Sequence, residues 1–103
     1  MTQEEINQRI SVEPILSFNV TFTVTSLKGT KEEVDKDDYY GCKENADGTT
    51  SLHYLTGNPD CEVDCFKVKE TPKEVEALYM AAIRAKRDAY KKYDIIEVAD
   101  LGK

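Results

Sequence analysis

The sequence has no tryptophan, a single histidine and no apolar run of the length that crosses a membrane. With one histidine and no recognisable motif around a serine or cysteine, nucleophilic catalysis lacks an evident general base. No phosphate-binding loop or dinucleotide-binding fingerprint occurs either. We therefore expect a protein that is not an enzyme and that needs no cofactor.

The first ten residues lack the apolar stretch of a secretory signal peptide, so we expect a soluble cytoplasmic protein with reduced thiols and no membrane partner. Cys42, Cys61 and Cys65, together with His53, could supply four zinc ligands. On an extended strand, however, Cys61 and Cys65 would lie about 13 Å apart. We therefore expect no bound metal. A disulfide between Cys42 and Cys65 is the alternative, although it would be unusual in the cytoplasm.

Positive charge is scarce, because 14 lysine and arginine residues stand against 20 acidic residues and the formal net charge is −6. This balance opposes direct nucleic-acid binding, which requires cations that neutralise phosphates. The charge is also uneven. Residues 1–70 carry 14 acidic and 7 basic residues, whereas residues 71–103 carry 6 and 7. A basic segment thus stands on an otherwise acidic molecule.

Alternation of apolar and polar residues identifies the strands. Residues 16–25 alternate throughout, which indicates a strand with one buried face. Three further segments are predicted to form an antiparallel meander: 39–44, 49–56 and 62–69.

The segments between these strands are predicted from their turn and charge content. Asn45–Gly48 and Gly57–Asp60 read as turns, because glycine supplies the positive φ of a tight hairpin. The charged stretch 31–38 is predicted to be a loop or a helical turn. The stretch Thr2-Gln-Glu-Glu5 reads as a capping box and favours a short helix that reaches about Arg9, and the alternative is a frayed terminus.

The start of a long helix is well marked. Thr71 suits the N-cap, Pro72 the first helical position and Glu74 the third, which completes a capping box. Apolar residues then recur at helical spacing, and the stripe predicted to face the sheet is Val75, Leu78, Tyr79 and Ala82. We run this helix to about Lys92 and expect 94–98 to be a short edge strand or a packed tail.

These elements predict a single α+β domain over residues 1–103. An antiparallel sheet of about four strands packs its apolar face against one long C-terminal amphipathic helix. The residues assigned to that face are Leu16, Phe18, Val20, Phe22, Val24, Leu52, Tyr54, Phe66 and Val68. Because so small a core buries little apolar area, we also expect a homo-oligomer formed through the long helix.

The basic end of the helix is the first candidate binding site. Arg84, Arg87 and Lys91 are spaced so that they share a helix face. Guanidinium groups pair with phosphates and aromatic rings stack on bases. The interpretation is a site for a small anionic nucleotide, with Tyr90, Tyr93 or Phe66 as stacking residues. The alternative is that these bases only complement the helix macrodipole on a solvated face.

The acidic surface is the basis of a second functional hypothesis. The stretch Asp35-Lys-Asp37-Asp38 begins like a calcium-binding loop, but Tyr40 stands where glycine is required, so we interpret it as a solvated acidic loop. An acidic surface could instead cover a basic or nucleic-acid-binding site on a host protein. The residues assigned to it are Glu32, Glu33, Asp35, Asp37, Asp38, Asp60, Glu62 and Asp64.

Two segments also carry a resemblance to known families. Gly48-Thr-Thr-Ser-Leu-His-Tyr-Leu-Thr-Gly57 and Val68-Lys-Glu-Thr-Pro-Lys-Glu-Val75 are similar to the hairpin and helix start of flagellar FlbD-like proteins, although residues 58–64 form a longer connection here. A short acidic protein of this layout also resembles phage anti-defence proteins of the anti-Thoeris family. That resemblance implies a phage-encoded oligomer that sequesters a cyclic nucleotide signal, and it assigns no role to any residue.

Overall fold

The computed structural model describes residues 1–15, 17–57 and 62–101. Two helices flank six strands. In chain order the elements are α1 (Gln3–Gln8), β1 (Ile10–Ile15), β2 (Ser17–Thr25), β3 (Lys31–Asp35), β4 (Tyr39–Glu44), β5 (Thr50–Leu55), β6 (Val63–Val68) and α2 (Pro72–Leu101).

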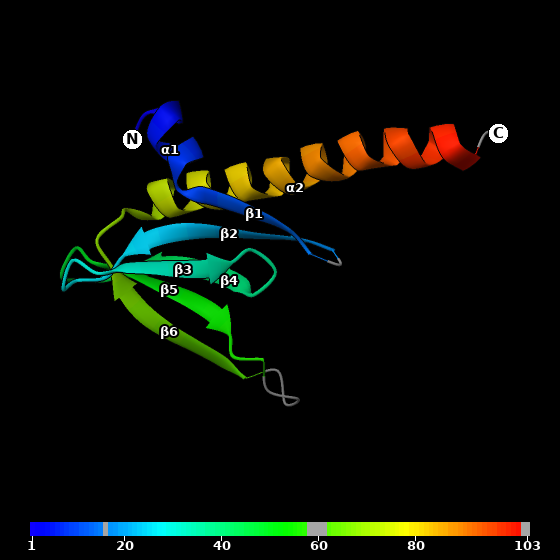
Figure 1. The fold of residues 1–103 in the computed structure, drawn as a ribbon. Helices are drawn as coiled ribbons and strands as arrows, with labels where there is room; N and C mark the ends of the chain where they lie inside the picture. The colour runs from blue at the N-terminus through cyan, green and yellow to red at the C-terminus, as the bar shows by residue number, and fades with distance from the viewer. Residues whose placement is uncertain (16, 58–61, 102–103) are drawn as a thin grey trace.

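The strands form two antiparallel sheets of three strands each, in the orders β1-β2-β3 and β4-β5-β6. The sheets meet at one end, where Ser26 forms a bridge with Val68 and the Lys69 N–H donates to the Thr25 carbonyl at 2.8 Å. Figure 1 shows α2 lying along the strands on the side of β1 and β2. The predicted α+β class, the antiparallel meander and the long C-terminal helix are confirmed.

The core lies where the two sheets and α2 meet. Its fully buried side chains come from three strands, β2, β5 and β6, and from the predicted stripe of α2: Val20, Phe22, Val24, Leu52, Val68, Val75, Leu78 and Ala82. The ring of Phe22 contacts Tyr39 and Tyr79 edge-on, with ring centres 5.7 and 6.5 Å away. Leu16 and the side chain of Phe18, which we assigned to the same face, lie outside the described part of the chain.

The start of α2 has the predicted capping box. The Glu74 N–H donates to Thr71 Oγ1 at 3.2 Å, and the Thr71 N–H donates to Glu74 Oε1 at 3.0 Å. The predicted end was wrong, because the backbone of 94–98 is helical rather than extended and α2 continues to Leu101. No glycine or proline stands between Pro72 and Gly102 to end the helix, and the β-branched residues of 94–98 disfavour helix only weakly.

Three segments within residues 1–35 confirm an expectation, extend it or differ from it. The short helix after Thr2 is present as α1, with the Glu5 N–H donating to Thr2 Oγ1 at 3.2 Å. Residues 10–15 form the strand β1, about which the sequence analysis made no prediction. Residues 31–35, predicted to be a loop or a helical turn, form the strand β3 because they pair with β2 along their whole length. Tertiary pairing here overrides a weak local signal.

The structure describes one of the two predicted turns in full and the other only in part. The turn at Asn45–Gly48 is present, and Gly48 adopts the expected positive φ of 86°. Of the turn predicted at 57–60, residues 58–60 lie outside the described residues. Within the described part of the chain, neither helix combines the length and the apolarity that a membrane crossing requires.

Candidate functional site

The basic end of α2 carries three of the residues predicted to bind an anion. Arg84, Arg87 and Lys91 are all exposed, and their spacing places them on one side of the helix. Tyr90 is 37% exposed and stands beside Lys86, whose Nζ lies 5.8 Å from the centre of the tyrosine ring. The bases and this ring therefore lie along one stretch of helix.

Phe66 does not join this group. It lies in β6, on the far side of the strands from the C-terminal half of α2 (Figure 1). Its ring packs edge-on against Tyr54, with 5.8 Å between the ring centres. The side chain of Tyr93 lies outside the described residues. Of the three aromatic residues predicted to stack on a ligand, the described structure places Tyr90 alone beside the bases.

Lys86 connects α2 to the turn between β3 and β4 through an ion pair with Asp37. Its Nζ lies 3.3 Å from Asp37 Oδ2, and Lys36 Nζ lies 2.6 Å from Asp37 Oδ1. The hydrogen bond from Lys36, supported by Lys86, lowers the pKa of Asp37 below its ordinary value despite partial burial. The Asp38 N–H closes the turn by donating to the Asp35 carbonyl at 3.0 Å. The stretch that begins like a calcium-binding loop is thus a short turn held by lysines.

An open cleft of about 910 Å³ lies between β3 on one side and β5 and β6 on the other. It runs the length of β3, from Ser26 in the preceding turn to Asp38 in the following one. Its buried and half-buried lining has an apolar part, with Val34 from β3, Tyr54 from β5 and Phe66 from β6. The gap between β3 and the pair β5 and β6 is therefore open, and the rings of Tyr54 and Phe66, which also pack against the core, are partly accessible inside it.

Carboxylates outnumber ammonium groups around this cleft. The charged residues that line it are Glu32, Glu33, Asp35, Asp38, Lys28 and Lys67. Partial burial, followed by repulsion from Asp35 and Asp37, raises the pKa of Asp38. A cation placed beside these carboxylates would relieve the repulsion between them.

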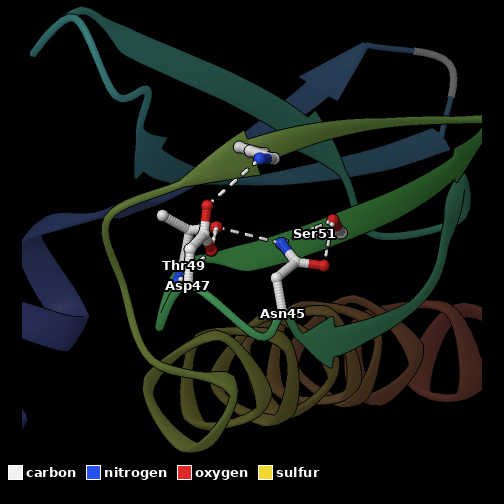
Figure 2. Close-up of polar contacts among 5 residues, drawn as sticks. Asn45, Asp47, Thr49 and Ser51 are labelled. Atoms are coloured by element: carbon white, nitrogen blue, oxygen red, sulfur yellow. Dashed lines mark hydrogen bonds and ion pairs between the residues drawn. The ribbon is translucent and has the colours of Figure 1, made fainter.

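Lys67, one of the two lysines of the cleft, is paired with the turn between β4 and β5. Its Nζ lies 3.3 Å from Asp47 Oδ2. Asp47 Oδ1 also accepts from Thr49 Oγ1 at 2.6 Å and from the Thr49 N–H at 3.0 Å, and these bonds, with Lys67, lower the pKa of Asp47 to about 2. Figure 2 shows this cluster, in which the Asn45 amide donates to both Thr49 and Ser51. Because Asp47 lies outside the cleft lining, Lys67 neutralises the cleft carboxylates only in part.

Strand register corrects the alternatives considered for the cysteines. Cys42 lies opposite Leu52, whereas Cys65 lies opposite His53. Because Leu52 and His53 are consecutive in β5, the two pairs project from opposite faces of the sheet. Cys42 therefore cannot form a disulfide with Cys65 or share a zinc ion with Cys65 and His53. Cys61 lies outside the described residues.

The Cys42 thiol faces the start of α2. Its Sγ lies 3.7 Å from the Pro72 carbonyl oxygen and 3.6 Å from Glu76 Oε1, which also accepts a hydrogen bond from the Tyr39 hydroxyl at 2.8 Å. Burial raises the pKa of Cys42, and the nearby Glu76 carboxylate adds to this shift. A thiol kept protonated in this way is a packing group and hydrogen-bond donor rather than a nucleophile.

The sequence signalled the acidic part of the cleft but not its apolar part. Glu32, Glu33, Asp35 and Asp38 belong to the acidic surface predicted from composition, and all four line the cleft. Of the other residues assigned to that surface, Asp60 lies outside the described residues. The signal that could have revealed β3 in the sequence was Val34, the one apolar residue in a charged run. In the structure its side chain is buried because 31–35 form a strand that pairs with β2.

Comparison with known proteins adds no relative to this picture. No family model, no curated protein and no solved structure matches the chain. The resemblance to FlbD-like and anti-Thoeris proteins therefore stays a prediction, and the function has to be argued from the geometry of the chain itself.

Proposed function

We propose that this protein is a non-enzymatic binding protein whose acidic cleft holds an extended basic segment of a partner protein. The observation that carries the proposal is the composition of the cleft, in which exposed and half-buried carboxylates surround a half-buried aromatic pair, Tyr54 and Phe66. Apolar side chains of a partner would gain contact area against the two rings, and its cationic groups would approach Glu33 and Asp35. The protein would act by covering a basic site on its target.

The charge of the whole chain supports the same partner. A formal net charge of −6 attracts a basic partner over long range and speeds encounter at low salt. Exposed charge pairs at the rim contribute mainly to the association rate and to specificity, so binding should weaken as salt is added. The buried aromatic contacts should supply the part of the affinity that salt does not remove.

The first experiment is a selection from a random ten-residue peptide library displayed on phage, with the immobilised protein as bait. The expected result is enrichment of peptides rich in lysine and arginine over a resin without protein. Enrichment of neutral or acidic peptides, or none over the bare resin, would contradict the proposal.

Reversing one rim charge tests where such peptides bind. Glu33→Lys changes an exposed residue of the cleft that makes no described side-chain hydrogen bond, and it should weaken a labelled lysine-rich peptide about tenfold at 50 mM salt, with a smaller difference at 500 mM. Fluorescence anisotropy measures both affinities. The matched control is Glu44→Lys, an exposed strand residue outside the cleft lining, which should change affinity far less. Equal losses for both variants would show that binding follows net charge and not the cleft.

A second candidate is the nucleotide sponge predicted from the basic helix end. Its supporting observation is that Arg84, Arg87 and Lys91 are exposed on one side of α2. Native mass spectrometry of protein purified gently from its host would detect a carried ligand and the number of subunits together. A nucleotide-sized mass that is lost in Arg87→Ala, with the fold intact, would favour the sponge over the acidic cleft.

A further inference from the structure

The outer edge of β3 offers backbone hydrogen-bonding groups to the cleft. The Lys36 N–H donates to the Val20 carbonyl at 3.0 Å, and the Ser26 N–H donates to the Thr30 carbonyl at 2.9 Å. Both residue pairs continue the register of β2 with β3. Because hydrogen-bonded and non-hydrogen-bonded pairs alternate, even-numbered residues of β3 bond to β2. The N–H and C=O groups of Lys31 and Glu33 consequently point outward.

The edge of β6 is the other backbone edge beside the cleft, but it is partly satisfied. The hydrogen bond from the Thr56 N–H to the Glu62 carbonyl shows that even-numbered residues of β6 bond to β5. The backbone N–H and C=O groups of its odd-numbered residues therefore point outward. The Cys65 N–H already donates to Asp64 Oδ1 at 2.8 Å, and just beyond the strand Lys69 already bonds to Thr25. Of the two edges, β3 therefore has the more complete set of groups for a new strand.

We infer that the partner segment binds as an additional strand on the outer edge of β3. This inference rests on the proposed function and specifies how the cleft is used. Side chains of an added strand alternate between the two faces of the sheet. One set would stand next to Val34 and face Tyr54 and Phe66, and the other would stand next to Glu33 and Asp35. The recognised segment is thus one in which apolar and basic residues alternate.

A second copy of this chain is a poor occupant of the same edge. The strand sequence Lys31-Glu-Glu-Val-Asp35 carries three carboxylates. Pairing β3 with β3 of another copy places at least one carboxylate directly opposite another in each antiparallel register with substantial overlap. Like charges directly opposite destabilise a pair of strands, whereas basic residues at those positions stabilise it.

Two peptides of identical composition test the alternation. One is a ten-residue peptide in which lysine and valine alternate, and the other has five lysines followed by five valines. Anisotropy with labelled peptides should show the alternating peptide binding at least about fivefold more tightly, since only its lysines and valines segregate to opposite faces of a strand. Equal binding of the two would overturn strand addition and leave the acidic-cleft proposal standing. Failure of both to bind would contradict the proposed function itself.

A proline substitution tests the backbone groups. Glu33→Pro removes an N–H that points outward, so the ladder between β2 and β3 is retained, and Glu33→Gln removes the same charge but keeps the N–H. Strand addition predicts that the alternating peptide binds Glu33→Pro about fivefold more weakly than Glu33→Gln, which corresponds to about one lost hydrogen bond. Equal affinity for the two variants would overturn the inference.

A measurement on the unmodified protein keeps the test independent of folding. Alternating peptides can be N-methylated at every second residue, in either of two registers. A peptide bound as a strand tolerates methylation of N–H groups that face away from β3 and should lose at least about fivefold in affinity when the paired groups are blocked. Equal affinity of the two registers would contradict strand addition.

Discussion

Replacing Phe22 with alanine is expected to lower the free energy of unfolding by about 3–5 kcal/mol. Phe22 is fully buried between the sheets, and its ring contacts those of Tyr39 and Tyr79. Removing it leaves a cavity that rigid neighbours on two strands and a helix cannot fill. Since domains of this size have total stabilities of about 5–15 kcal/mol, the variant should be partly unfolded at 37 °C. Urea unfolding followed by circular dichroism measures the change.

Phe66 provides the matched control for that prediction. It is also a phenylalanine on a strand, but it is half-buried and faces the open cleft. Phe66→Ala should cost only about 1–2 kcal/mol of stability, because less apolar area leaves water in folding. It should nonetheless weaken binding of a basic peptide. Equal destabilisation by the two substitutions would show that the cleft is part of the core and not an accessible site.

Glu70→Ala is expected to destabilise the fold by about 2–4 kcal/mol. The Glu70 side chain is 6% exposed, and it accepts from Arg9 Nη1 at 2.7 Å and from the Thr25 N–H at 2.8 Å. These bonds connect the segment before α2 to β2 and to the end of α1. Their loss leaves a partly buried guanidinium and a partly buried N–H without their acceptor, which costs more than losing an exposed pair.

The same unfolding experiment contains its own controls. Glu44→Ala removes an exposed glutamate outside these contacts and should change stability by less than about 0.5 kcal/mol. Arg9→Ala and the double variant complete a cycle with Glu70→Ala. A coupling energy near zero would contradict the view that the two side chains stabilise the fold together.

The free energy of unfolding should depend on pH through the ionisation of Glu70. Burial alone would raise its pKa, but the hydrogen bonds from Thr25 and Arg9 outweigh burial and lower it below the ordinary value of 4.5. With a folded-state pKa below the unfolded value, the contribution of Glu70 is complete above pH 4.5 and is lost as pH falls through the folded-state pKa. Urea unfolding at several pH values should therefore show the gap between native protein and Glu70→Gln shrinking below pH 4.5. A gap that stays constant on acidification would contradict this.

Most of the candidate site depended on one strand that local sequence could not identify. Residues 31–35 contain one apolar residue among charges, which gives no alternation to read, and only pairing with β2 makes them a strand. Once β3 is in place, its carboxylates stand across from Tyr54 and Phe66, residues far away in sequence. The basic residues of α2 were readable from helical spacing, but Phe66 was assigned to them without any information on distance.

The sequence by itself determined the class of this fold, because alternation over 16–25, the glycine-bearing turn before β5 and the capping box at Thr71 are local signals with local physical causes. It also determined part of the core, since Phe22, Leu52 and Leu78 are apolar at the spacing of their elements. Only the tertiary structure decided that the strands divide into two sheets, that α2 packs on the side of β1 and β2, and that a cleft stays open between β3 and the pair β5 and β6. Those outcomes depend on pairing between distant segments, whose free energy comes from long-range contacts and not from any window of neighbouring residues.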